Sequence, residues 1–327
     1  MVSGFINVNK PPGITSFQVI SRLRRITGIR KLGHSGVLDK PATGVLPVGI
    51  NRANKLFNFF ETFTKSYLTT FLLGFATNTD DVTGRVLATG DAGRVSDKEV
   101  KLALRQFVGE ISQRPPAFST TKVEGKEFYR YALAGEEVPY RLKRVTVDDI
   151  EVLGYKEGPR GKELLDELPH LTSSIPEDLR TKLLTLRIKC RGGFYVRSLA
   201  RDLGELLRSE GCVFTLVREQ VGPFRVEEAW TLEALEGLAE AGRLDEAIEP
   251  MSVIAEADET LKLDQASIEK LSQGMHIVVK ARYVPERSRR HGASMFVAGP
   301  DGEIAVVVEV GMPVGPNLPL KPKRVLR

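Results

Sequence analysis

The residues best suited to chemistry cluster in one polar turn, "RKLGHSGVLDKPATGVLPVGI" at 30–50, which runs into an apolar segment. Asp39 could serve there as a nucleophile or as a base. Ser35 nearly fits the G-x-S-x-G elbow of hydrolases, but Val37 occupies the position of the last glycine, where a tight turn has no room for a Cβ atom. The alternative is a plain turn, in which the glycines supply positive φ, Asp39 closes the bend and His34 lies on the surface. Taken alone, the fragment favours the plain turn.

Two further stretches carry aromatic and basic side chains in strand-like sequence. In "GGFYVR" at 192–197 the alternation would point Tyr195 and Arg197 to the same face of a strand. Tyr67 in "KSYLTTFLL" and Leu216 in "FTLVREQVGPF" belong to types that usually fill a core. By themselves the residues leave both interpretations open, a surface or core role and a functional one.

Composition argues against several classes of protein. The 327 residues are 42% hydrophobic and 27% charged, which is ordinary for a globular chain with one large and one small domain. No apolar run reaches the roughly 20 residues of a membrane span, and the start lacks the features of a signal peptide, so we expect a cytoplasmic protein. Cys190 and Cys212 form no C-x-x-C pair, the histidines are widely spaced, and no GxGxxG or Walker motif occurs. We expect no disulfide framework, no metal and no cofactor.

The net charge of +5 hides an uneven distribution of charge. Residues 227–260 hold eleven acidic side chains and one basic one, so the rest of the chain has 46 Lys and Arg against 31 Asp and Glu. A body that basic suits a polyanionic partner such as a nucleic acid, because neutralised phosphates release counterions. Many basic proteins bind no nucleic acid, however, and charge alone leaves the partner open.

The elements that would position the reactive residues mix helices and strands. Thr15 with Gln18, and Ser96 with Glu99, fit capping boxes that start helices, and Asn51 is predicted to cap another helix. The other predicted elements are strands at 66–77, 143–155 and 182–196, a short basic helix within 113–138, and helices at 197–211 and 232–250. Strands and helices alternate without a strict βαβ rhythm, which predicts an α+β fold with a mixed, largely antiparallel sheet.

Two domains are expected, a large domain at 1–251 and a small β-rich domain at 252–327. The second is indicated by short apolar runs separated by glycine and proline, at 276–283, 293–299 and 303–310. Within the first, residues 155–180 are polar, contain prolines and have no clean periodicity. We interpret them as a surface insertion without chemistry.

Six segments, in order, resemble the motifs of the TruB family of tRNA pseudouridine synthases. The turn at 30–50 is similar to the family's G-H-G-G-T-L-D-P-x-A-T-G-V-L signature. The other matches are "NVNKPPGITS" to K-P-x-G-x-T-S, "KSY" to the strand tyrosine, "TNTDDVTG" to T-x-T-x-D-x-x-G, "FVGEISQRPPAFSTTKVEGKEFY" to F-x-G-x-x-x-Q-x-P-P-x-x-S, and "CRGGFYVRSLARDLG" to C-x-x-G-x-Y-x-R-x-L-x-x-D-x-G. They extend over residues 4 to about 224, and together they are very specific.

The chain departs from these motifs at a few positions. Ser35 stands in place of a usual glycine, Val37 of threonine and Lys40 of proline, and Thr120 and Thr121 replace an A-V pair. None of these changes removes a group that the reaction needs. Pro41 still biases residue 40 toward an extended backbone.

The resemblance implies an isomerisation in which uracil leaves the ribose through N1, rotates and rejoins it through C5. Asp39 would be the carboxylate that acts on the sugar, either as nucleophile or as base. Arg197 would be the cation that keeps this carboxylate ionised.

The resemblance also implies a pocket for the base. The ring of Tyr67 would stack on the uracil, and its hydroxyl could accept the C5 proton. Tyr195 and Leu216 would complete the pocket. His34 would fill the space left when the target uridine flips out of the RNA stack.

The expected substrate is tRNA, at uridine 55 of the T arm, bound by basic segments and by a PUA-like domain at 252–327. We expect no membrane association and no obligatory protein partner. Two alternatives remain, a guide-RNA-dependent pseudouridine synthase that needs partner proteins, and a catalytically idle RNA-binding protein of the same fold.

Overall fold

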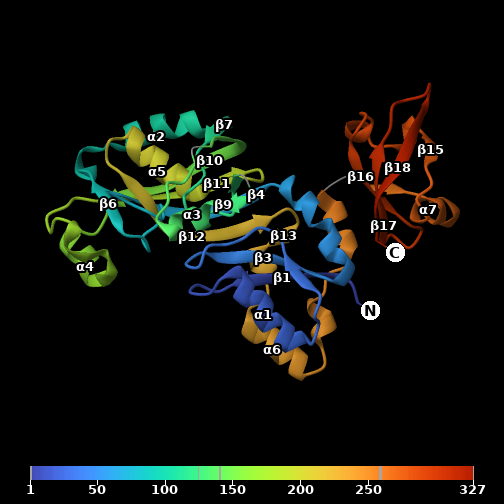
Figure 1. The fold of residues 1–327 in the computed structure, drawn as a ribbon, viewed down its shortest axis with the longest axis horizontal. Helices are drawn as coiled ribbons and strands as arrows, with labels where there is room; N and C mark the ends of the chain where they lie inside the picture. Colours follow the sequence, from blue (N-terminus) through green and yellow to red (C-terminus); the bar gives the residue numbers. More distant parts are fainter. Residues whose placement is uncertain (1, 124, 140, 258–259, 327) are drawn as a thin grey trace. The chain divides into compact units, whose positions relative to one another are not determined.

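The computed structural model describes residues 2–123, 125–139, 141–257 and 260–326 (Figure 1). Contacts between Cα atoms divide the chain into two compact units. Unit 1 comprises Met1–Asp39, Val45–Phe60 and Val221–Arg327, and unit 2 comprises Lys40–Gly44 and Glu61–Gln220. The boundary expected at residue 251 therefore stays a prediction, because unit 1 joins segments from both sides of it.

Unit 2 is built on a largely antiparallel sheet. Its strands follow the order β12 (Gly211–Val221), β4 (Lys65–Leu73), β11 (Lys182–Cys190), β10 (Lys143–Glu157) and β7 (Gly109–Gln113). The pairs β4–β11, β11–β10 and β10–β7 are antiparallel. The start of β3 (Thr43–Ile50) adds a parallel pair to β12, with Thr43 opposite Val217. The predicted α+β class with a mixed sheet is confirmed.

Two helices cover the core of this sheet, α2 (Asp97–Leu104) and α5 (Val196–Leu206) (Figure 1). The predicted capping box starts α2, because Ser96 Oγ accepts from the amide of Glu99 at 3.3 Å and Glu99 Oε2 accepts from the amide of Ser96 at 2.8 Å. Val100, Leu199 and Leu203 are fully buried against the strands. The two helices therefore complete one hydrophobic core with β4, β10 and β11.

Smaller elements complete unit 2. These are β5 (Phe75–Thr77), β6 (Val86–Thr89), β8 (Lys122–Val123), β9 (Lys126–Glu127), α3 (Phe128–Ala134) and α4 (Gly161–Glu167), with the 3-10 helices η2 (Ala92–Arg94), η3 (Arg105–Phe107) and η4 (Pro169–Ser174). In the segment 155–180, Leu164 on α4 and Leu171 on η4 are buried with Phe75 and Cys212 in a core of their own. The polar residues around these two leucines leave no clean periodicity in the sequence, so this packing was not predicted.

Unit 1 begins with β1 (Gly4–Lys10), α1 (Ser16–Thr27) and β2 (Leu32–His34), and β2 runs antiparallel to β3. The predicted box of Thr15 and Gln18 caps α1. Further on lie β13 (Phe224–Arg225), α6 (Leu232–Glu240) and the 3-10 helices η5 (Val226–Glu228), η6 (Leu244–Ala247) and η7 (Met251–Ala257). Val19 and Leu23 of α1 are fully buried in a core shared with α6.

The helix predicted to begin at Asn51 is a 3-10 helix and not an α-helix. The segment η1 (Asn51–Glu61) is a 3-10 helix, and Asn51 has a left-handed φ of 51°. A capping residue adopts an extended backbone instead, so the prediction that Asn51 caps a helix is wrong. Its side chain donates to the carbonyl of Val2 at 2.7 Å.

A second sheet is formed by the last residues of unit 1. Its order is β14 (Thr260–Lys262), β16 (Ser294–Ala298), β17 (Ile304–Val310), β18 (Asn317–Val325) and β15 (Ile277–Lys280), accompanied by α7 (Gln265–Ser272) and the 3-10 helices η8 (Ala281–Tyr283) and η9 (Glu286–Ser288). It has a separate hydrophobic core, which includes Leu271, Val306 and Leu320. The three predicted strands are confirmed as β15, β16 and β17. Within the described residues, no helix is both long and apolar enough to cross a membrane.

Candidate active site

Arg197 lies in the first turn of α5. Strand β11 ends at Cys190, Gly193 takes a left-handed φ of 89°, and Tyr195 precedes the helix as its capping residue. The expectation that Tyr195 and Arg197 alternate along a strand is therefore wrong, because the glycine turn breaks the strand before them. A helix was predicted at 197–211, and α5 starts one residue earlier, at Val196.

Two backbone carbonyls fix the guanidinium group of Arg197, which is only 6% exposed. Its Nη1 donates to the carbonyl of Thr79 at 2.9 Å, and its Nη2 donates to the carbonyl of Phe118 at 2.9 Å. These acceptors belong to different segments, the turn at 77–84 and the segment at 114–121 that follows β7. A planar, rigid fork held at two of its nitrogens has a defined orientation.

The side chains of the TNTDDVTG segment build the turn at 77–84. Asp81 Oδ1 accepts hydrogen bonds from Thr79 Oγ1 at 2.8 Å, from the Thr83 amide at 2.9 Å and from Thr83 Oγ1 at 2.5 Å. A Cβ atom at Gly84 would collide with the hydroxyl of Thr79. The residue types of this motif thus shape the turn that presents the Thr79 carbonyl to Arg197.

Tyr67 and Leu216 belong to the main core of unit 2. Tyr67 lies on β4 opposite Ile188 of β11 and is 8% exposed. Leu216 on β12 is partly buried and packs against the same cluster. Tyr195 is tied down from three sides, because its amide and carbonyl bond the side-chain amide of Gln113 at 2.9 and 3.0 Å and its hydroxyl lies 2.9 Å from Thr121 Oγ1.

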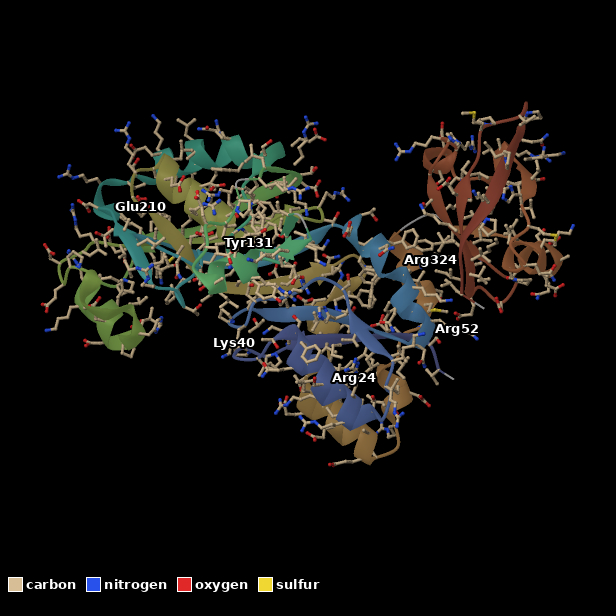
Figure 2. The ribbon with its side chains drawn as sticks, viewed as in Figure 1. Arg24, Lys40, Arg52, Tyr131, Glu210 and Arg324 are labelled. Carbon is tan, nitrogen blue, oxygen red and sulfur yellow. The ribbon has the colours of Figure 1, made fainter. Side chains whose placement is uncertain are left out.

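His34 and Asp39 lie in unit 1, and both are half-buried. His34 ends β2 opposite Val48 of β3. Both Gly33 and Gly36 were expected to supply positive φ, but only Gly36 does, with a φ of 71°, and Gly33 does not. Lys40, which replaces the family's usual proline, is exposed (Figure 2).

The opening motif K-P-x-G-x-T-S anchors the backbone next to Asp39. The Leu38 amide donates to Ser16 Oγ at 2.9 Å, and Ser16 Oγ donates to the Leu38 carbonyl at 3.2 Å. Ser16 is the first residue of α1 and is 2% exposed. Lys10, fully buried, donates to two carbonyls of its own turn at 2.7 and 2.9 Å. The sequence does not indicate this role of Ser16, because its partner Leu38 lies 22 residues away and no local pattern links the two.

Gly44 explains the end of the A-T-G-V-L segment. Its φ is 100°, and a Cβ atom would overlap the backbone of Arg218 on β12. Only glycine allows β3 to come this close to β12. The side chain of Arg218 is 2% exposed.

Burial shifts the pKa values of three further side chains of unit 2. Burial, aided by the charge of Arg218, lowers the pKa of Lys65 to about 8. Burial raises the pKa of the Cys190 thiol to about 12 and that of Cys212 well above its ordinary value. Among the residues that the structure describes, no group of three or more His, Cys, Asp or Glu could hold a metal ion.

Comparison with family models accounts for most of the first 256 residues. Residues 24–196 match the model of the TruB family pseudouridylate synthase N-terminal domain. Residues 197–256 match the tRNA pseudouridylate synthase B C-terminal domain.

Several curated bacterial proteins are similar to the whole chain or to most of it. A tRNA pseudouridine synthase B of Moorella thermoacetica is 31% identical over 329 residues, which cover 100% of both chains. Another, from Caldanaerobacter subterraneus subsp. tengcongensis, is 37% identical and covers 84% of this chain and 86% of its own. A third, from Corynebacterium aurimucosum, is 40% identical and covers 75% and 76%.

Solved structures share the fold. A chain in the crystal structure of a Cbf5-Nop10-Gar1 complex aligns with a TM-score of 0.71, at 22% identity, over 99% of this chain and 85% of that one. A chain in the structure of an H/ACA RNP bound to a substrate RNA containing 2'-deoxyuridine aligns with a TM-score of 0.69, at 20% identity, with the same coverage.

Proposed function

This chain belongs to the TruB family of tRNA pseudouridine synthases, isomerases that act on tRNA, and from that premise we propose that it converts uridine 55 of the T arm with Asp39 as the reacting carboxylate. The observation that carries the assignment of Asp39 is the anchoring of its loop. Leu38, directly before Asp39, is bonded through both backbone groups to the buried Ser16. A reacting group needs such a fixed backbone, because small displacements are costly in rate.

The reaction requires a carboxylate at the ribose, a hold on the detached base and an acceptor for the C5 proton. In one form of the proposal Asp39 attacks C1′, a C–O bond forms as the C1′–N1 bond breaks, and the carboxylate leaves again when C5 bonds to C1′. In the other, Asp39 removes a proton from the sugar and returns it later. Both begin from ionised Asp39, and we assign to Arg197 the positive charge that favours this form.

The base is held, in this proposal, by Tyr67, Tyr195 and Leu216. The packing of Tyr67 and Leu216 on one cluster of unit 2 supports a shared role. So does the fixed position of Tyr195, whose hydroxyl bonds Thr121. The ring of Tyr67 stacks on uracil, and its hydroxyl takes the C5 proton before the product leaves.

His34 acts on the RNA rather than on the base. A target uridine must leave its stack, at a cost of a few kcal/mol, before a carboxylate can reach its sugar. An imidazole at the end of β2, with Gly33 before it and Gly36 two residues after it, can occupy the vacated space.

Two basic regions would bind the phosphates. The Nζ atom of Lys126 on β9 lies 4.1 Å from the ring centre of Tyr131 on α3, so an aromatic face and a cation lie together. On the second sheet Lys321, Lys323 and Arg324 are exposed, and Figure 2 shows Arg324 on this sheet and Tyr131 on α3. Such residues suit an RNA backbone, and the second sheet fits the PUA-like role expected of residues 252–327.

A guide-RNA-dependent synthase is the second candidate, because the solved structures that share the fold include an H/ACA RNP. Those chains are only 20–22% identical to this one, whereas relatives named tRNA pseudouridine synthase B reach 40%. We therefore favour a synthase that needs no protein partner. A catalytically idle RNA-binding protein is the third candidate, and the presence of Asp39, Tyr67 and Arg197 argues against it.

The test is an assay of purified protein on an unmodified tRNA transcript without added factors, with pseudouridine mapped by position. We expect product at uridine 55 alone. Asp39→Asn should abolish product and leave the tRNA Kd within about tenfold, because phosphate contacts hold the RNA. Product at another uridine would overturn the site preference, a requirement for added RNA or protein would favour the second candidate, and turnover by Asp39→Asn near wild type would remove Asp39 from the mechanism.

A further inference from the structure

A second arginine on α5 contacts the same two segments as Arg197. Arg201 lies one helical turn further along. Its Nη1 donates to Asp80 Oδ2 at 2.9 Å, in the turn at 77–84, and its Nη2 donates to the Arg114 carbonyl at 2.9 Å, in the segment at 114–121. Each segment is thus held twice by successive turns of one helix.

We infer that Arg201 and Asp80 form a clamp that positions Arg197 for the reaction, an inference that rests on the proposed function. Arg197 takes its orientation from the carbonyls of Thr79 and Phe118. Asp80 follows Thr79 directly, so a displacement of Asp80 moves one of these carbonyls. Arg201 and Asp80 are positioning residues, and neither acts on the substrate.

The turn passes through an unfavourable backbone conformation at Asp80. Asp80 has a φ of 59°, in the left-handed region that side chains with a Cβ atom seldom adopt, although aspartate tolerates it better than most. Its carbonyl accepts from the Val213 amide at 3.0 Å, and the Val82 amide donates to the Val213 carbonyl at 2.9 Å. These bonds tie the turn to β12, and the Arg201 side chain ties it to α5.

The segment at 114–121 is also held by more than one hydrogen bond from α5. The Arg114 carbonyl accepts from Ser198 Oγ at 2.7 Å as well as from Arg201 Nη2. Asp202 bonds Arg201 Nε at 2.9 Å and Nη2 at 2.7 Å, which fixes the arginine from its own helix. Arg201 is therefore a rigid link rather than a surface side chain.

The pair is a property of this chain rather than of the motifs. In T-x-T-x-D-x-x-G the position of Asp80 is unspecified, and the specified aspartate is Asp81. In C-x-x-G-x-Y-x-R-x-L-x-x-D-x-G the position of Arg201 is likewise unspecified, and the specified residues are Arg197 and Asp202. Two unspecified positions, 121 residues apart, thus carry matching charges that meet.

Electrostatics gives the clamp a dependence on pH. Asp80 is 8% exposed, and burial raises its pKa to about 6 against the attraction of Arg201 and Arg197. The other charged or titratable groups around it are Asp81 on its own turn, Asp202 on α5, the thiol of Cys212 on β12, and His170 on η4, whose Nε2 lies 2.7 Å from the Val82 carbonyl of the same turn. Above about pH 6 Asp80 is ionised and binds Arg201, and below it the pair loses its charge.

A buried carboxylate with a raised pKa destabilises the folded protein above that pKa, since folding disfavours its charged form. The clamp is therefore formed at neutral pH at the expense of stability. Removing the charge should leave the fold as stable or more stable while it harms the reaction. A merely structural ion pair would lower stability and rate together.

The experiment compares wild type, Asp80→Asn, Arg201→Met and Arg201→Lys, with Asp97→Asn as control because its pair with Lys101 is exposed. The measurements are the single-turnover rate constant at saturating tRNA, the tRNA Kd and the urea midpoint. We expect Asp80→Asn and Arg201→Met to lower the rate constant about tenfold, with Kd within about twofold and no loss of stability for Asp80→Asn. Arg201→Lys should recover part of the rate, and Asp97→Asn should change nothing.

The pH profile supplies the second readout. The wild-type rate constant should fall as pH drops from 7 to 5, and the ratio of wild type to Asp80→Asn should fall with it toward one. An unchanged rate constant in Asp80→Asn, or a ratio that does not vary with pH, would overturn the clamp. So would parallel losses of rate and stability.

Failure of the proposed function gives a different pattern. If wild type makes no pseudouridine, amide hydrogen exchange of residues 78–84 reports on the clamp alone. Faster exchange in Asp80→Asn and Arg201→Met supports the clamp, and unchanged exchange overturns it.

Discussion

Replacing Ser16 by alanine tests whether the opening motif serves the reacting loop. The hydroxyl accepts from the Leu38 amide and donates to its carbonyl, so the substitution removes two buried hydrogen bonds. Each is worth about 1 kcal/mol net, and the buried Leu38 amide left without its acceptor adds a penalty, for a total loss of about 2 to 3 kcal/mol. Because Leu38 adjoins Asp39, we also expect a fall of about tenfold or more in the single-turnover rate constant.

The neighbouring residue supplies the control. Thr15→Ala removes the cap of α1, which costs about 1 kcal/mol, but it leaves the bonds to Leu38 intact. Urea unfolding and single-turnover assays on both variants separate stability from positioning. Equal rate constants for the two variants, or a rate constant for Ser16→Ala at the wild-type level, would refute the reasoning that the serine holds the loop.

Three other predictions concern charge and burial. Because folding depresses the pKa of Lys65 to about 8, the free energy of unfolding should increase as pH rises from 8 to 10.5. Lys65→Met should remove this pH dependence and raise the free energy of unfolding by about 1 to 2 kcal/mol at pH 7, as measured by urea unfolding. A pH profile of stability that is the same in Lys65→Met and wild type would contradict this prediction. Cys190 and Cys212, both buried with raised pKa values, should resist a thiol reagent at pH 8 until urea is added, so rapid labelling of the native protein would disprove their placement. Neutralising the exposed Lys321 and Arg324 should reduce the slope of log Kd against log salt for tRNA by about one to two, whereas an identical slope would mean that they contact no phosphate.

Sequence patterns predicted the elements whose causes are local. The capping box of Thr15 and Gln18 depends on residues within one turn of helix, and it is present. The alternation in β10 and the apolar runs of β15 to β17 likewise reflect the faces of single strands. The α+β class follows from counting such elements.

The remaining features depend on contacts between distant residues. Asn51 has the side chain of a helix cap, but its backbone is turned into the left-handed region and its side chain reaches Val2. The strand-like alternation before Arg197 is overridden by the turn at Gly193. Candidate residues could be named from the resemblance, but the carbonyls that orient Arg197 are 118 and 79 residues away in sequence and no local pattern indicates them.

The pairing of β3 with β12 bears on how the protein emerges from the ribosome. Thr43 and Gly44 pair with Val217 and Arg218, which are synthesised much later. Phe5 likewise packs against Phe224, with 5.6 Å between the two ring centres. At about 5 to 20 residues per second, synthesis takes roughly 10 to 35 seconds to produce these partners. During that interval the apolar side chains of the first sixty residues have nothing to pack against from the distal part of the chain. The nascent N-terminal segment is therefore a natural client for chaperones that shield apolar surface, and a translational pause between residues 60 and 217 would lengthen its exposure.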